Sequence, residues 1–247
     1  MQKVVLITGA ARRIGAEIAR YFHTQSYNVI VHYRTSEQEA LNLQQELNQI
    51  RPNSVVIIKA DLANLVNTDF VTEFVTRIRG FYGQLDVLVN NASTFFATPL
   101  GNSNLEQWRD LMVSNAGGPF FLAQALMADL KKTQGSIINI SDIHGVRPMK
   151  GYSIYSIAKA ANDMLTKTLA RELAPEINVN GVAPGPVLWP EHENELNSEE
   201  KHSILRKTLS GRQCTALNIA KTVLFLAENK DITGQVLAVD GGRSIKN

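Results

Sequence analysis

The stretch Val4-Val-Leu-Ile-Thr-Gly-Ala-Ala-Arg-Arg-Ile-Gly15 decides the fold class of this chain. Its four leading apolar residues predict a short buried strand, and a helical pattern follows the turn and runs to about Thr24. Glycines at such a turn let the backbone approach a pyrophosphate, which then lies at the positive end of the helix. Gly9 and Gly15 fit this role, and Arg13 occupies a place that a middle glycine often fills. Two glycines at a turn are a weak signal alone, so the rest of the chain has to support it.

Short β-branched segments alternate with helical patterns along the whole chain. The predicted strands are Lys3–Ile7, Asn28–His32, Ser54–Lys59, Leu85–Val89, Ser136–Ile140, Asn178–Val182 and Gln235–Val239. This alternation predicts an α/β fold, a doubly wound parallel sheet of the Rossmann type with helices on both faces. No repeat or linker interrupts it, so we expect a single domain over residues 1–247. Residues 184–211 form the least regular region, and we expect them to act as a substrate loop.

Composition argues against several classes of protein. The chain has 247 residues, of which 44% are hydrophobic, and its net charge of +2 comes from scattered Lys and Arg, which does not favour nucleic-acid binding. The lone Cys214 suits the reducing cytoplasm. No stretch looks long and apolar enough to span a membrane. The histidines have neither the spacing nor the cysteine partners of a zinc site, so we expect no metal.

The end of the second predicted strand, His32-Tyr-Arg-Thr-Ser36, indicates which nucleotide the turn would bind. A site for NAD has a carboxylate about twenty residues beyond the glycines, where it bonds the ribose 2′-hydroxyl. Here the first acid is Glu37, and Arg34 lies at the strand end with Arg12 in the glycine turn. A guanidinium can hold a 2′-phosphate through two hydrogen bonds. An ordinary polar strand end is the alternative, but the arginines favour NADP(H).

Tyr155 and Lys159 lie four residues apart on a helix predicted from Tyr155 to Ala174, so the phenol and the ammonium share one face. A nearby positive charge stabilises phenolate and lowers the pKa of the tyrosine from about 10 towards neutrality, which suits a general acid. The spacing alone is equally compatible with a solvated helix face. Asn90-Asn-Ala-Ser93 follows the fourth strand, beside the crevice expected in an open sheet.

Pro119 affects the backbone one helical turn before it. Proline has no N–H, so the carbonyl oxygen of Asn115 loses its usual helical partner. We predict that this carbonyl accepts a hydrogen bond from water or a lysine. A kink needed only for packing explains the segment equally well.

Together these motifs resemble the short-chain dehydrogenase/reductase family over essentially the whole chain. The resemblance rests on Thr8–Gly15, Asn90–Ser93, Asn115, Tyr155 with Lys159, and Pro184-Gly185. A closer similarity, to the pteridine reductases within that family, rests on the same glycine turn, His32-Tyr-Arg34, Asn90–Phe95 and Asp142. It implies an NADPH-dependent reductase that takes a dihydropterin to the tetrahydro form. Family members commonly form homotetramers, and the apolar helices around residues 111–130 and 155–173 are the expected interface.

The resemblance also implies roles for individual residues. Tyr155 would donate a proton, Lys159 would bind the nicotinamide ribose and lower the tyrosine pKa, and the Asn115 carbonyl would hold a water linked to Lys159. The catalytic positions are Asn115, Asp142, Tyr155 and Lys159. The cofactor positions are Gly9, Arg12, Arg13, Ile14, Gly15, His32, Tyr33, Arg34, Ser36, Asp61, Leu62, Asn91, Ala92, Ser93, Tyr155, Lys159, Pro184 and Gly185, with Asp61 at the adenine.

The expected substrate contacts lie on the other side of the nicotinamide. They are Arg13, Ser93, Phe95, Asp142, Tyr155, Leu188 and Trp189. By resemblance Phe95 is the aromatic ring that sandwiches the pterin, although an anchor in the core is the alternative for this residue. Trp189 belongs to an apolar substrate-side wall, with a packing anchor for the following helix as its alternative.

Asp142 is the main departure from the broad family, most of whose members have there a serine that polarises a substrate carbonyl. Ser141 is adjacent, but strand alternation points it to the opposite face. A turn-forming carboxylate is the plain alternative for Asp142. Our hypothesis is that Asp142 opposes Lys159 and holds Tyr155 more fully protonated, because a like charge raises the pKa of an acid. Two other functions stay open: reduction of 3-oxoacyl thioesters or small ketones, and a non-catalytic NADPH-binding sensor.

Overall fold

The computed structural model describes residues 2–187 and 197–246. Within them, seven parallel strands form one sheet in the order β3-β2-β1-β4-β5-β6-β7. The strands are β1 (Val4–Ile7), β2 (Asn28–Tyr33), β3 (Val55–Lys59), β4 (Val87–Asn90), β5 (Ser136–Ile140), β6 (Asn178–Pro184) and β7 (Val236–Val239). The predicted Rossmann-type architecture is confirmed, and each predicted strand boundary lies within two residues of the observed one.

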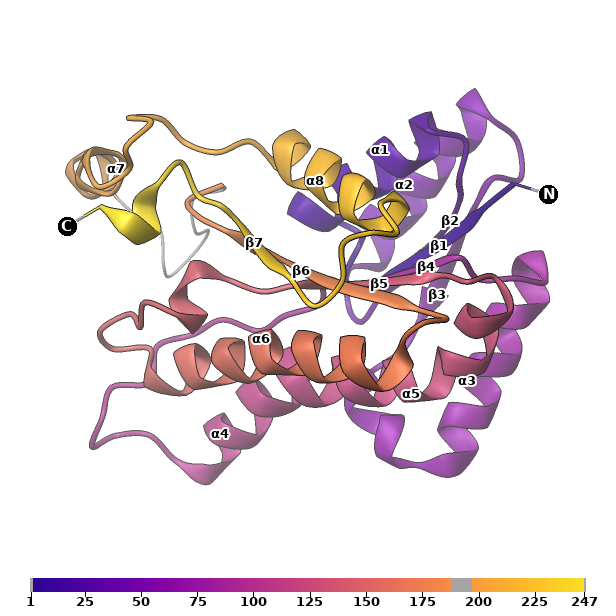
Figure 1. Cartoon of the computed structure of the whole chain (residues 1–247), viewed down its shortest axis with the longest axis horizontal. Coiled ribbons are helices and arrows are strands. Elements are labelled where there is room, and N and C mark those ends of the chain that lie inside the picture. The colour runs from indigo at the N-terminus through magenta and orange to yellow at the C-terminus, as the bar shows by residue number, and fades with distance from the viewer. Residues whose placement is uncertain (1, 188–196, 247) are drawn as a thin grey trace.

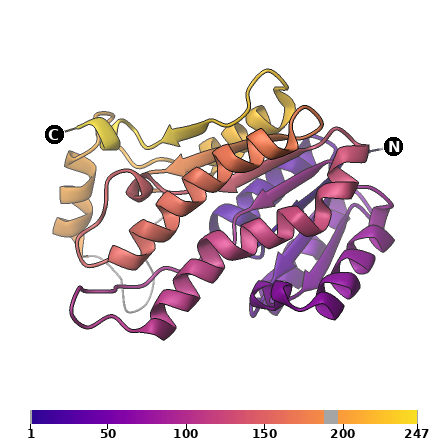
Figure 2. The same ribbon diagram turned by 60° about the horizontal axis from the view of Figure 1, so that its bottom comes forward.

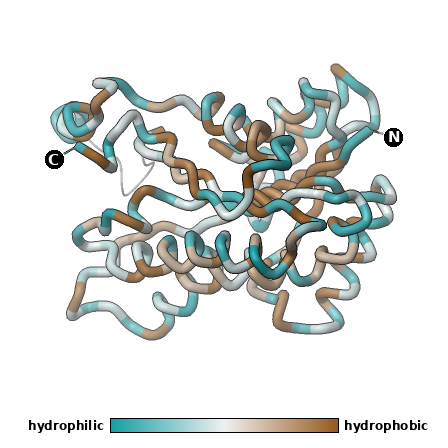
Figure 3. The backbone as a smooth tube through the Cα atoms, in the orientation of Figure 1, coloured by the Kyte–Doolittle hydropathy of each residue, from teal (hydrophilic) through white to brown (hydrophobic). Residues whose placement is uncertain are grey.

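Helices cover both faces of the sheet (Figure 1). One face packs against α1 (Arg13–Thr24), α2 (Glu37–Ile50) and α8 (Ala216–Glu228). The other packs against α3 (Thr68–Tyr82), α5 (Gly118–Lys132) and α6 (Ser153–Leu173), and Figure 2 shows α5 and α6 crossing the sheet side by side. Successive residues of β1 point to opposite faces, so both faces need apolar side chains. Figure 3 accordingly shows the hydrophobic residues concentrated along the central strands.

The direction of strand order reverses at β1, which pairs with β2 on one side and β4 on the other. Ligands of open α/β sheets bind outside the carboxyl ends of the strands at such a reversal. The glycine turn follows β1 and Asn91–Ser93 follows β4, so the topology brings these two segments to the same crevice.

A continuous helical stretch from Leu105 to Lys132 joins α4 (Leu105–Met112) to α5 through a π-helical turn, η2 (Val113–Gly117). The backbone disturbance expected one helical turn before Pro119 therefore takes the form of this π-helical turn, which contains Asn115. Of the described residues, this stretch alone is long and apolar enough to span a membrane by length and composition, contrary to the sequence expectation, although a core helix passes the same test. Leu122, Leu126 and Leu130 of α5 are fully buried against the sheet.

The predicted irregular region, 184–211, also contains the helix expected to follow Trp189. This helix, α7 (Ser198–Arg206), begins at a capping box between Asn197 and Glu200. Leu188 and Trp189 lie outside the described residues, so their predicted place in the substrate wall stays a prediction.

Candidate active site

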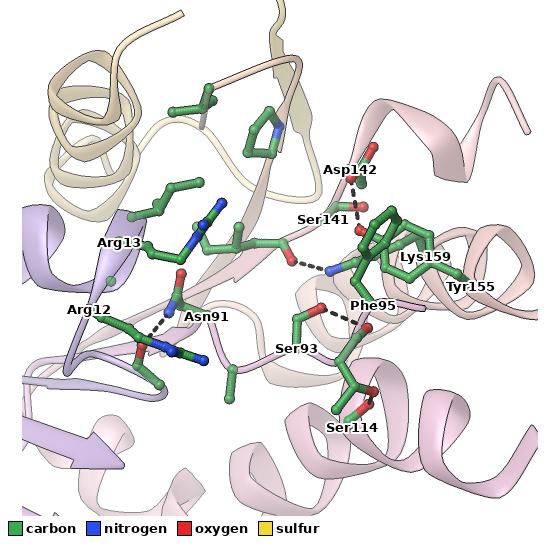
Figure 4. A pocket seen from close by; sticks show the side chains of 18 of the residues that line it. Arg12, Arg13, Asn91, Ser93, Phe95, Ser114, Ser141, Asp142, Tyr155 and Lys159 are labelled. Atoms are coloured by element: carbon green, nitrogen blue, oxygen red, sulfur yellow. Dashed lines mark hydrogen bonds between the residues drawn. The ribbon is translucent and has the colours of Figure 1, made fainter. Parts of the chain in front are cut away.

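A cleft of about 940 Å³ opens at the carboxyl ends of the strands (Figure 4). Every residue predicted to contact the cofactor lines it, from Gly9 in the first turn to Gly185 after β6. Three of the four predicted catalytic residues, Asp142, Tyr155 and Lys159, lie at one end with Phe95. The fourth, Asn115, does not line the cleft. No group of three or more metal-ligating side chains occurs among the residues that the structure describes.

The glycine turn has little room for side chains. A Cβ atom on Gly15 would lie 2.5 Å from the carbonyl oxygen of Gly9, and one on Gly9 would lie 3.0 Å from the Cα of Ala92. Arg13 adopts a φ of 57°, the left-handed conformation that glycine accepts most easily, in the place that a middle glycine often fills. The N-terminus of α1 has no side-chain cap and no acid in its first turn, so its N–H groups and dipole fit an anion such as pyrophosphate.

His32 and Asn91 hold this turn in place. The backbone N–H of Gly9 donates to His32 Nδ1 at 3.1 Å, and His32 Nε2 lies 3.1 Å from the carbonyl oxygen of Ala60. Burial lowers the pKa of His32 to about 4, so the ring is neutral and carries its proton on Nε2. Asn91 Nδ2 donates to the carbonyl oxygens of Thr8 and Gly9 at 2.8 and 3.0 Å. Both side chains therefore support the turn from behind.

The first acid after β2 is already occupied. Glu37 accepts hydrogen bonds from the Tyr33 hydroxyl and from Lys59 Nζ, both at 3.2 Å. Arg12 and Arg34 are exposed and line the same end of the cleft. This corner presents positive charge, which fits a phosphate group better than a ribose hydroxyl that needs an acceptor.

Tyr155 and Asp142 meet at the opposite end of the cleft, where the Tyr155 hydroxyl donates to Asp142 Oδ2 at 2.8 Å. Burial, then the charge of Asp142 and this hydrogen bond, raise the pKa of Tyr155 well above 10. The expected lowering of the Tyr155 pKa by Lys159 is therefore wrong for this structure, because burial and the adjacent carboxylate raise it. The direction agrees with the hypothesis that Asp142 keeps the phenol protonated.

Lys159 is fully buried beneath the tyrosine. Its Nζ donates to the carbonyl oxygen of Ile140 at 3.0 Å and lies 5.7 Å from the centre of the Tyr155 ring. Burial lowers the pKa of Lys159 to about 8, while the charges of Asp142 and Asp163 raise it. The lysine is therefore largely protonated at neutral pH.

Phe95 forms an aromatic wall beside the phenol. Its ring stacks on Tyr152 with a centroid distance of 4.7 Å and an interplanar angle of 9°, and it meets Tyr155 edge to face at 4.8 Å. The residue is 39% exposed, so it is not an anchor in the core. It leaves apolar surface available beside the reactive hydroxyl.

The carbonyl oxygen of Asn115 has a different partner from the one predicted. It accepts from Asn162 Nδ2 at 2.7 Å, not from a lysine. The side chain of Asn115 is buried, accepting from the Ser93 hydroxyl at 2.6 Å and donating to the Thr94 carbonyl at 3.1 Å. Asn115 therefore fixes the segment after β4 from behind. Asn162 was missed, although it lies three residues beyond Lys159 on a buried helix face, where an amide is unusual.

Several other cleft residues also went unpredicted. They include Ser114, His144, Met149, Tyr152, Glu200, Ile204 and Arg243. Tyr152 could have been found from the sequence, because it precedes Tyr155 by three residues, about one helical turn. Arg243 could not, because only the fold returns the chain after β7 to the substrate end.

Comparison with known proteins gives the family. A family model described as enoyl-(acyl carrier protein) reductase matches residues 9–244. The chain is 36% identical to pteridine reductase 1 of Leishmania tarentolae, over 98% of this chain and 96% of that protein. It is also 36% identical to a 3-oxoacyl-(acyl-carrier-protein) reductase of Staphylococcus epidermidis, over 98% and 99% of the two chains. The chain therefore belongs to the short-chain dehydrogenase/reductase family, a family of NAD(P)H-dependent oxidoreductases.

Proposed function

We propose that this oxidoreductase reduces a pterin with NADPH, taking a dihydropterin to its tetrahydro form. The hydrogen bond from Tyr155 to Asp142 carries the proposal. A carboxylate repels the oxyanion that develops when a ketone is reduced, but it accepts hydrogen bonds from the N–H groups of a pterin. Phe95 adds an aromatic surface for a flat heterocycle. Sequence identity does not distinguish the two candidate substrates, since this chain is equally similar to a pteridine reductase and to a 3-oxoacyl reductase.

NADP(H) is the proposed cofactor. The uncapped N-terminus of α1 and the glycine turn fit the pyrophosphate, and Arg12 with Arg34 fits the 2′-phosphate. Lys159 would hold the nicotinamide ribose, and Asp61, at the rim of the cleft, would contact the adenine. When bound, NADPH supplies the hydride.

The residues of the chain supply and direct the proton. At neutral pH Tyr155 keeps its proton, because burial and Asp142 raise its pKa. Since this O–H points at Asp142, donation to a ring nitrogen requires the hydroxyl to turn from the carboxylate to the substrate. A water held by Arg13 and Asp142 would be a second source of the proton. The charged Lys159 beneath stabilises the negative charge left on the phenol.

The experiment is NADPH oxidation with dihydrobiopterin, dihydromonapterin, dihydrofolate, a small ketone and a 3-oxoacyl thioester. We expect turnover of at least one pterin, and a loss of about 10²–10⁴-fold in Tyr155→Phe with NADPH affinity retained. Turnover of the ketone or thioester alone would refute the pterin assignment and favour the 3-oxoacyl function, which the Staphylococcus relative supports. NADPH binding without turnover of any substrate would indicate a sensor.

Asp142→Ser tests the carboxylate itself. Removing the like charge lowers the pKa of Tyr155, so the alkaline limb of the pH–rate profile should move to lower pH and alcohol oxidation should improve. An unmoved profile with no gain in alcohol oxidation would show that Asp142 does not tune the phenol.

We also propose a cytoplasmic homotetramer. The helices α4, α5 and α6 leave large apolar side chains exposed, among them Trp108, Phe120, Ile157 and Met164. Light scattering of the purified protein measures the oligomeric state, and a monomer would contradict the proposal.

A further inference from the structure

Successive residues from Asn139 to Asp142, at the end of β5, each bond to a different position on α6. In three pairs a side chain of one element bonds a side chain of the other, and in the fourth a lysine donates to a carbonyl oxygen. The pairs are Asn139–Thr166, Ile140–Lys159, Ser141–Asp163 and Asp142–Tyr155. Two of these pairs hold proposed catalytic groups. A third brings in Asp163, a buried carboxylate that the mechanism above does not use.

Asp163 is largely buried between α6 and the segment that follows β5. It is 9% exposed, and its Oδ1 accepts a short hydrogen bond from the Ser141 hydroxyl. A Cβ atom on Gly145 would lie 2.8 Å from Oδ2, so this oxygen packs directly on the backbone of η3 (Ile143–Gly145). Lys159 lies one helical turn before Asp163 and Lys167 one turn after it, on the same face of α6. Of these two lysines, Lys159 is buried and Lys167 is exposed.

The charges around Lys159 show what Asp163 contributes. The ammonium faces Asp142 from the end of β5, Asp163 from α6, and the Tyr155 ring. Both carboxylates raise its pKa against the larger effect of burial, which leaves it at about 8. Burial raises the pKa of Asp163, while the Ser141 hydrogen bond and the charges of Lys159 and Lys167 lower it. Asp142 is engaged by the Tyr155 hydroxyl and lines the cleft, whereas Asp163 does not line it.

We propose that Asp163 is a positioning residue, a second counter-charge that keeps the Lys159 ammonium protonated while Asp142 is engaged by the phenol and the substrate. Ser141 holds this carboxylate in place, which gives a role to the serine that lies beside the catalytic position but does not face it. The inference rests on the proposed role of Lys159 at the cofactor ribose, and it does not depend on the substrate being a pterin.

The test is NADPH affinity measured against pH by the fluorescence of the bound nicotinamide, which requires no turnover. For the native protein, affinity should decline above about pH 8, where Lys159 loses its charge. In Asp163→Asn the midpoint of this decline, the pH at which affinity has fallen by half, should lie about one pH unit lower. This gives about fivefold weaker binding at pH 8 and near-native binding at pH 6. Asp163→Glu should keep the native midpoint, and Ser141→Ala should keep a midpoint close to the native one because the charge of Asp163 remains.

Asp129→Asn is the matched control, since Asp129 is 8% exposed on α5, pairs with Arg79 and does not line the cleft. It should lower thermal stability without moving the midpoint. Affinity that falls equally at every pH in Asp163→Asn would overturn the proposal. If that variant does not fold, Asp163→Ser, which keeps a partner for Ser141, should give the same displacement. A displaced midpoint in a protein that turns over no substrate would refute the proposed function and leave this inference standing.

Discussion

Protonation of His32 is expected to destabilise the protein between pH 6.5 and 4. The buried ring accepts a hydrogen bond from the N–H of Gly9 and donates one to the carbonyl oxygen of Ala60. Burial lowers the pKa of the ring from 6.5 to about 4. The unfolded chain therefore binds the proton first, so the stability due to the neutral ring is complete above pH 6.5 and is lost as the pH falls through the folded pKa. Relative to pH 7, this loss is about 2 kcal/mol at pH 5 and about 3 kcal/mol at pH 4.

Urea unfolding at pH 7, 6 and 5, at one protein concentration, measures this loss when the native protein is compared with His32→Gln. The glutamine cannot titrate, so the stability advantage of the native protein should shrink by about 2 kcal/mol between pH 7 and 5. His23, also buried with a lowered pKa, titrates in both proteins and cancels. NADPH affinity should fall in parallel, because His32 holds the glycine turn. An advantage that stays constant across this range would refute the reasoning.

Three further substitutions test other parts of the site. Gly15→Ala places a Cβ 2.5 Å from the carbonyl oxygen of Gly9, so the glycine turn has to shift. NADPH binding measured by calorimetry should be lost while the circular dichroism spectrum stays native. Native affinity for NADPH would contradict this prediction. Arg34→Gln should weaken NADPH binding at least about tenfold, because a charge-assisted hydrogen bond to the 2′-phosphate is lost, and should leave the affinity for NADH unchanged. Equal losses of affinity for the two nucleotides would show that Arg34 does not bind the 2′-phosphate. Asn162→Leu leaves the buried Asn115 carbonyl without its donor and should cost about 1–3 kcal/mol in urea unfolding, and unchanged stability would exclude this role.

The fold was predictable because parallel strands are buried on both faces. Runs such as Val4–Ile7 are therefore apolar on both sides and stand out between helical patterns. Their carboxyl ends share one edge of the sheet, so residues that follow different strands could be assigned to one cleft before any contact was known. The helix that follows Trp189 was expected, and the capping-box spacing of Asn197 and Glu200 marks where α7 begins.

The electrostatics of the site could not be predicted in the same way. Spacing places Lys159 beside Tyr155, but the pKa of the phenol depends first on how deeply packing buries it. The partner of the Asn115 carbonyl likewise depends on how α6 lies against η2, a tertiary contact without a local pattern. Arg243 reaches the cleft only because the chain returns after β7.

The four successive bonds between the end of β5 and α6 also constrain how this enzyme can diversify. One inserted residue between Asn139 and Asp142 would turn the carboxylate to the other side of the chain and break every pairing after it. The length of the segment from Asn139 to Asp142 is therefore constrained as closely as its side chains. New substrate preferences have to arise at the rim of the cleft, where Phe95, Glu200 and Ile204 come from segments outside residues 139–142 and α6. Directed-evolution libraries restricted to that rim should change specificity while most of their members remain folded and able to bind NADPH.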